Sequence, residues 1–110
     1  MNTLLQLIED NIQNPALEVD FLCTRMNISR TKLYQKIKGI SGQSVGEFIK
    51  TIRLKRAIYI MTHEDVTLAE VADRIGLQSS SYFSRMFKKA YGSAPSEFVR
   101  GLRNGKGAGL

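Results

Sequence analysis

A chain of 110 residues, 43% hydrophobic and 24% charged, has the composition of a globular protein and is long enough for one compact domain or two very small ones. Lysine and arginine outnumber the acids by 16 to 10, and the resulting net charge of +6 favours a polyanionic partner. Charges interrupt every apolar run well short of the roughly 18 residues of a membrane span, and the first residues lack the basic segment of a secretory leader, so we expect a cytoplasmic protein without membrane segments.

Apolar residues recur every three to four positions along the whole chain, and this period predicts an all-α fold of seven helices without strands. We expect the helices at about residues 3–13, 19–26, 30–39, 44–61, 68–75, 80–91 and 95–102. The 44–61 helix is the longest, and a helix of that length measures about 27 Å at 1.5 Å per residue.

Local signals mark several of the expected helix ends. Asn27 tolerates the left-handed conformation that often follows a helix, and Ser29 is a suitable N-cap for the next one. Thr67 and Glu70 have the spacing of a capping box, in which each side chain accepts a free backbone N–H of the other residue. Gly76 then supplies a left-handed turn. These signals predict two short turns, each between a pair of helices.

The apolar positions of the helices predict the core. The expected core residues are Leu4, Ile8, Ile12, Leu22, Cys23, Leu33, Ile37, Ile40, Val45, Phe48, Ile49, Ile52, Ala57, Ile60, Phe83, Phe87, Ala90, Phe98 and Leu102. We also expect Tyr82 and Met86 in the core rather than on a surface that stacks bases. Cys23 is the only cysteine, so we interpret it as a small core residue rather than a reactive thiol.

Residues 19–49 and 68–99 resemble the same helix-turn-helix unit written twice. Residues 23–28 match residues 72–77 at an offset of 49, and one extra residue in the second copy then makes the offset 50. Two copies are too few for a solenoid, so the duplication of one small unit fits better. The predicted organisation is a first unit at 1–43, a linker helix at 44–62, a second unit at 63–103 and a disordered tail at 104–110.

Positive charge is concentrated in the second half of each copy. Residues 25–56 hold nine basic side chains and one acid, and residues 79–103 hold five and one. Most acids lie instead near the expected starts of helices, where the helix dipole favours them. A surface that is merely solvated more often mixes the two signs, so we interpret the basic stretches as a contact surface for DNA.

In a helix-turn-helix, one helix enters the major groove of duplex DNA while its partner lies against the backbone. The expected recognition helices are residues 30–39 and 80–91, in successive major grooves about 34 Å apart. Base edges are expected to meet Arg30, Thr31, Tyr34, Gln35, Ser80, Ser81, Ser84 and Arg85. Phosphates are expected to meet Lys32, Lys36, Lys38, Arg53, Lys88 and Lys89.

Arg85 and Gln35 are the most specific of these expectations, because arginine grips guanine and glutamine grips adenine through two hydrogen bonds. The length of the linker helix plus the width of the two units is of the same order as one turn of DNA. Because this helix fixes the spacing, some bending of the DNA is expected if both grooves are engaged.

The stretch RIGLQSSSYFSRMFKKAYGSAPSEF, residues 74–98, resembles the signature of the AraC/XylS transcriptional regulators. LYQKIKGISGQSVGEFIKTIRLKRA, residues 33–57, is similar to the first unit and linker helix of the same family. The resemblance covers about residues 4–103 and implies a seven-helix DNA-binding domain with base contacts at Thr31, Tyr34, Gln35, Ser80, Ser81, Ser84 and Arg85. The segments NPALEV, SRTKLYQKIKG and IRLKRA most resemble the output domains of hybrid two-component regulators.

This resemblance implies that sensor, kinase and receiver parts belong to a longer parent protein. RNA polymerase is then a further candidate partner. The isolated chain is expected to be a monomer, because the duplication lets one chain read two grooves. Dimerisation of the parent protein would require sequence outside these 110 residues.

Two other functions stay open from the residues alone. One is a helical protein-interaction module whose basic face binds an acidic partner. The other is a binder of single strands or RNA, which is disfavoured because few aromatic residues stand at stacking positions. We expect no enzyme, cofactor or metal site, since Ser29 to Lys32 lacks the companion motifs of serine acylases and His63 lacks further ligands.

Overall fold

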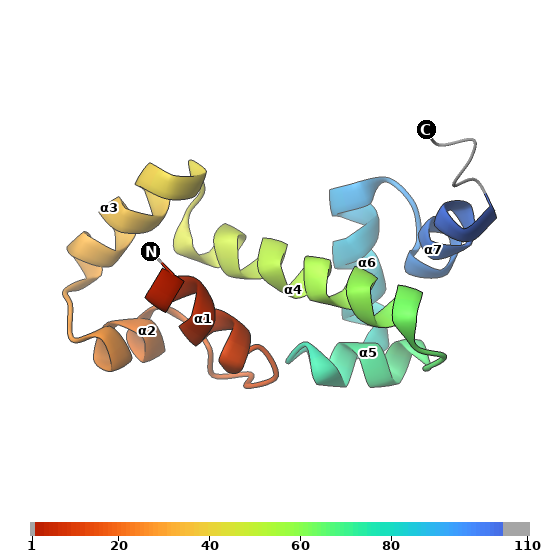
Figure 1. The fold of residues 1–110 in the computed structure, drawn as a ribbon, viewed down its shortest axis with the longest axis horizontal. Helices are drawn as coiled ribbons and strands as arrows, with labels where there is room; N and C mark the ends of the chain where they lie inside the picture. The colour runs from red at the N-terminus through yellow and green to blue at the C-terminus, as the bar shows by residue number, and fades with distance from the viewer. Residues whose placement is uncertain (1, 105–110) are drawn as a thin grey trace. The chain divides into compact units, whose positions relative to one another are not determined.

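In the computed structural model, which describes residues 2–104, the chain is helical and contains no strand within that range. The helices are α1 (Asn2–Asp10), α2 (Val19–Met26), α3 (Arg30–Ser41), α4 (Val45–His63), α5 (Leu68–Arg74), α6 (Ser80–Tyr91) and α7 (Pro95–Asn104), as Figure 1 shows. The all-α prediction is therefore confirmed. Asn104, placed in the tail by the sequence pattern, is the last residue of α7, and the rest of the predicted disordered tail, residues 105–110, lies outside the described residues.

The chain divides into two compact units between Arg53 and Leu54, in the middle of α4. We call the residues up to Arg53 the first unit and those from Leu54 the second unit. Val45 and Ile49 of α4 belong to the core of the first unit, whereas Leu54 and Ala57 belong to the core of the second. The two halves of this helix thus serve separate cores.

The first unit is built around α1, α2, α3 and the start of α4. Its buried core consists of Leu4, Ile8, Ile12, Leu17, Leu22, Leu33, Ile37, Val45 and Ile49. The α2–α3 connection has the predicted chemistry: Asn27 takes a left-handed φ of 57°, and the Ser29 hydroxyl accepts the backbone N–H of Lys32 at 3.1 Å. These two local features fix the direction in which α3 leaves the turn.

α1 ends three residues earlier than the pattern predicts. The N–H groups of Asn11 and Ile12 bond to carbonyls only three residues back, so the chain tightens into turns after Asp10. Ile12 nevertheless remains buried, with 7% of its surface exposed. The turn after α1 keeps Ile12 on the core side, so the helical spacing of apolar residues extends beyond the end of the helix itself.

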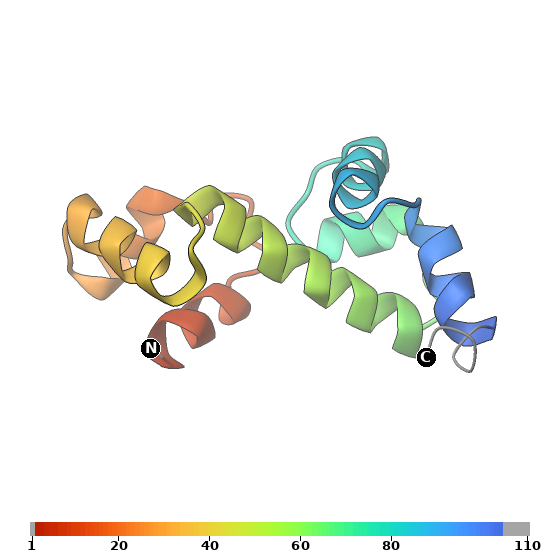
Figure 2. The same cartoon turned by 90° about the horizontal axis from the view of Figure 1, so that it is seen from above.

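The second unit packs α5, α6 and α7 with the end of α4, and α6 lies beside both α5 and α7 in Figures 1 and 2. Its centre is aromatic: the Phe87 ring lies 5.9 Å from Phe83, 4.7 Å from Tyr91 and 5.3 Å from Phe98 between centroids. The predicted capping box is present, with the Thr67 hydroxyl accepting from the Glu70 N–H and Glu70 accepting from the Thr67 N–H.

Four residues expected in the core are exposed. They are Ile40, Tyr82, Ala90 and Leu102. Ile40 lies in the last turn of α3, beyond the inward-facing Ile37. Tyr82 is rotated by about one residue, or 100°, from the buried Phe83 and therefore points outward. Cys23 is half-buried and packs against the first core rather than inside it.

Candidate nucleic-acid interface

α3 buries only two side chains, Leu33 and Ile37, which stand four residues apart on one face. Every other residue from Arg30 to Ile40 is exposed. The exposed residues that were predicted to contact DNA are Arg30, Thr31, Lys32, Tyr34, Gln35, Lys36 and Lys38. The helix therefore presents cationic and hydrogen-bonding groups around most of its circumference, which is the surface that a helix needs in a groove lined by base edges and phosphates.

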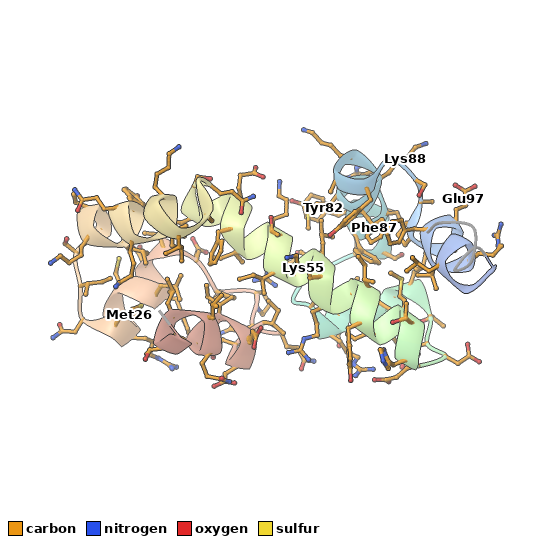
Figure 3. The ribbon with its side chains drawn as sticks, turned by 45° about the horizontal axis from the view of Figure 1, so that its top comes forward. Met26, Lys55, Tyr82, Phe87, Lys88 and Glu97 are labelled. Atoms are coloured by element: carbon orange, nitrogen blue, oxygen red, sulfur yellow. The ribbon has the colours of Figure 1, made fainter. Side chains whose placement is uncertain are left out.

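α6 has a similar division with a wider buried face. Phe83, Met86 and Phe87 face the core. Ser81, Arg85, Lys88 and Lys89 are exposed, and Ser80 and Ser84 are half-buried. In Figure 3 the Phe87 side chain lies on the core side of α6, whereas Lys88 extends away from it. All the predicted contact residues of α6 thus lie on a partly or fully accessible surface.

The arginines of α3 and α6 that were predicted to contact bases have different neighbours. Arg30 is the first residue of α3, and its Nη2 donates to Oδ1 of Asp20, in the first turn of α2. A hydrogen bond with the Tyr34 side chain and the charge of Asp20 together raise the pKa of Arg30. Arg85 is the sixth residue of α6, and its guanidinium carbon lies 6.0 Å from the ring centroid of Tyr82. This is cation–π range, near its outer limit.

Arg53 corrects the predicted phosphate set. Only 6% of its surface is exposed, and its Nη1 and Nη2 donate to the carbonyl oxygens of Ile12 at 2.9 Å and Asn14 at 3.3 Å. The guanidinium thus satisfies backbone carbonyls in the turn after α1, where a peptide oxygen without a donor would be costly. We assign Arg53 a structural role in the first unit and remove it from the predicted DNA contacts.

A hollow of about 630 Å³ lies in the first unit beside two of the predicted base-contacting residues. It is lined by Val19, Tyr34, Gln35, Lys38, Gln43, Ser44, Val45 and Gly46. The Gln43 amide donates to the Thr51 hydroxyl at 3.0 Å, so the connection between α3 and α4 is tied to α4 along the edge of the hollow. Sequence periodicity did not single out Gln43 or Ser44, because neither belongs to an apolar stripe.

Two further residues near the interface were missed for identifiable reasons. Asp20 is one of the acids near the start of a helix, where the dipole alone explains an acid, and it also bonds Arg30. Tyr82 was expected in the core, although 46% of its surface is exposed and its ring faces Arg85. The contact of Asp20 depends on the position of the neighbouring helix α3, which the sequence does not specify. The exposure of Tyr82 depends on the exact rotation of α6 about its axis, which the apolar spacing specifies only approximately.

The rest of the described chain offers little other chemistry. In residues 2–104, no group of three or more histidine, cysteine and acidic side chains has the arrangement of a metal site. His63 instead stacks on Tyr59, with ring centroids 4.1 Å apart. Among these same residues, none of the helices combines the length and apolarity that crossing a membrane requires.

The chain is similar to known helix-turn-helix proteins. Residues 22–101 match the family model described as a helix-turn-helix domain. The chain is 32% identical over 93 residues to "Histidine kinase P4" from Formosa agariphila; this match covers 84% of the chain and 7% of that kinase. The chain therefore spans only a small part of the length of this relative.

Two solved structures share the fold. The C-terminal domain of AraT, a response regulator from Geobacillus stearothermophilus, is 27% identical, with a TM-score of 0.82 over 90% of this chain and 82% of that one. The DNA-binding domain of AdpA, a global transcriptional factor solved with its target DNA, is 20% identical, with a TM-score of 0.84 over 97% and 96% of the two chains.

Proposed function

The chain belongs to the AraC/XylS family of helix-turn-helix domains, and from this membership we propose that it binds double-stranded DNA in a sequence-specific manner and thereby regulates transcription. It acts by binding rather than by catalysis. The observation that carries the proposal is the surface of the two recognition helices. α3 and α6 each bury an apolar face and leave cationic and hydrogen-bonding side chains accessible.

We assign base contacts and phosphate contacts by chemistry. Residues with directional donors and acceptors, or with an aromatic ring, are proposed to read base edges: Arg30, Thr31, Tyr34, Gln35, Ser80, Ser81, Ser84 and Arg85. Flexible lysines are proposed to bind phosphates: Lys32, Lys36, Lys38, Lys88 and Lys89. The three serines of α6 reach less far than amides, so base recognition by the second unit depends mainly on Arg85.

The relatives suggest the wider context. One is named a histidine kinase and another is the C-terminal domain of a response regulator. We therefore propose that this domain is the DNA-binding output of a two-component regulator that acts in the cytoplasm. Recruitment of RNA polymerase belongs to the same proposal, as does binding of the isolated domain as a monomer.

Selection from a pool of randomised duplexes at about 150 mM salt tests the proposal directly, because specific contacts must then outcompete the general attraction to phosphate. Enrichment of a motif with two clusters about one helical turn apart supports base recognition by both units. Retention of duplexes without enrichment contradicts sequence-specific binding. If no duplex is retained, the proposal is wrong, and the alternative of a basic protein-interaction module gains support.

A further inference from the structure

The pair formed by Asp20 and Arg30 links the starts of two consecutive helices. Asp20 lies in the first turn of α2, and Arg30 is the first residue of α3. Their side chains are 74% and 58% exposed. An ion pair this accessible adds little to folding stability, because water screens it and two long side chains lose freedom. The pair lies at the N-terminal end of α3, among the residues proposed to contact bases, so its role is better sought in DNA binding than in stability.

Arg30 keeps enough donors for a base while it remains paired. A guanidinium carries five N–H donors, and the Oδ1 of Asp20 accepts one from Nη2. Four donors remain, whereas a guanine edge accepts two. The pair and a base contact are thus compatible.

The second unit lacks this arrangement. Ala69 is the second residue of α5, as Asp20 is of α2, and Ser80 begins α6, as Arg30 begins α3. The arginine of α6 instead stands at the sixth position, where α3 has Gln35. The two recognition helices therefore carry their arginines more than one turn apart along the helix. Arg30 is paired with a carboxylate, whereas Arg85 lies near the Tyr82 ring.

We propose that Asp20 is a positioning residue for DNA recognition by the first unit: it orients Arg30 toward a base edge and offsets the charge that would otherwise draw Arg30 to a phosphate. This inference rests on the proposed function. It assigns the α3 arginine to sequence readout at the N-terminal end of the helix. Asp20 itself touches no base and acts through Arg30.

The test compares Asp20→Asn with a matched control, Glu18→Gln. Glu18 is the N-cap residue of α2, and its side chain makes no cap hydrogen bond. Both changes remove one negative charge near the same helix start, but only the first removes the charge that is paired with Arg30. The motif preferred by the wild-type chain is determined first. Affinities for that duplex and for single-base variants are then measured at several salt concentrations.

We expect Arg30→Ala to lose roughly 5- to 150-fold discrimination at one base pair, the range for one bidentate contact. Asp20→Asn should lose at least about 5-fold at the same pair. It should also steepen the salt dependence on unrelated duplexes by about one unit, because an arginine whose charge is no longer offset by a carboxylate gains a phosphate. Glu18→Gln should retain the wild-type selectivity. In the Arg30→Ala background, Asp20→Asn should have no further effect on selectivity.

The outcomes separate the two proposals. A wild-type chain that selects no sequence overturns the proposed function, and this inference with it. If the wild type is selective but Asp20→Asn has the same base preferences, the inference alone fails. It also fails if Asp20→Asn and Glu18→Gln change selectivity equally, or if Asp20→Asn still reduces selectivity when Arg30 is absent. Circular dichroism of each variant checks that the helices are retained.

Discussion

Arg74 and Glu64 are joined by two parallel hydrogen bonds, from Nη1 to Oε1 at 2.7 Å and from Nη2 to Oε2 at 3.0 Å. This two-pronged geometry ties the end of α5 to the segment that follows α4. Hydrogen bonding from Arg74 lowers the pKa of Glu64 below its ordinary value of 4.5. Because the folded state lowers the pKa of this carboxyl, its contribution to stability depends on pH.

The sign of this dependence follows from the direction of the shift. The stabilisation is fully present above the ordinary pKa and is lost as the pH falls through the lowered pKa of the folded state. We expect Glu64→Gln to unfold at lower denaturant concentration than the wild type near pH 7, and we expect this difference to vanish in acid. Glu97→Gln, which removes an exposed carboxylate on α7 (Figure 3), is the control. An equal difference at both pH values would contradict the role of the pair.

Arg53 should matter for folding and not for phosphate binding. Replacing it by methionine keeps much of the buried volume but leaves the carbonyl oxygens of Ile12 and Asn14 without the guanidinium. We expect a loss of about 2–3 kcal/mol in the free energy of unfolding, measured by urea denaturation. Below the unfolding transition, the salt dependence of duplex binding should not change. Lys38→Met is the matched comparison and should show the reverse pattern, with stability retained and the salt dependence reduced by about one unit.

Arg85 and Lys88 should differ in the kind of affinity that they supply. Arg85→Ala is expected to relax the preference at one or two base pairs and to cost roughly 1–3 kcal/mol on the preferred duplex. Lys88→Ala should weaken all duplexes to a similar extent. Titration of preferred and scrambled duplexes with each variant measures both effects. If neither change alters duplex affinity, the proposed interface on α6 is wrong.

The starts of α2 and α5 differ in their N-cap residues. Thr67 caps α5, whereas Glu18 stands at the corresponding position before α2 in an extended conformation without a side-chain cap. Thr67→Ala should cost about 1 kcal/mol of unfolding free energy. Glu18→Thr should stabilise the chain by up to about 1 kcal/mol, since the backbone already has the φ and ψ of an N-cap. Thermal unfolding followed by circular dichroism measures both, and destabilisation by Glu18→Thr would contradict the equivalence of the two positions.

The sequence predicts best what depends on neighbouring residues. The Thr67–Glu70 capping box, the left-handed Asn27 and the Ser29 cap could all be read from spacings of a few residues. The buried faces of α3 and α6 followed from the helical period, because each has a pair of large apolar residues four positions apart: Leu33 and Ile37 in α3, and Phe83 and Phe87 in α6. These features position α3 and α6 and leave their outer faces accessible.

Features that depend on distant contacts were not predictable. Arg53 looked like one more cation in a basic stretch, but its acceptors lie 39 and 41 residues earlier in the chain. Tyr82 looked apolar enough for the core, but the core positions around it are already filled by Phe83 and Met86. The pairing of Asp20 with Arg30 required the angle between two helices, which no pattern in one sequence provides.

The division of α4 at Arg53 affects local unfolding of the chain. Neither half of this helix reaches the length of about 12–15 residues at which an isolated helix becomes marginally stable in water. Each half therefore persists only while its own core is intact, and transient opening of one core should release the amide hydrogens of that half alone. We therefore expect two regions of separate hydrogen exchange within one continuous helix, and we expect a fragment that retains a single unit to lose the helical structure of the α4 half whose core is missing.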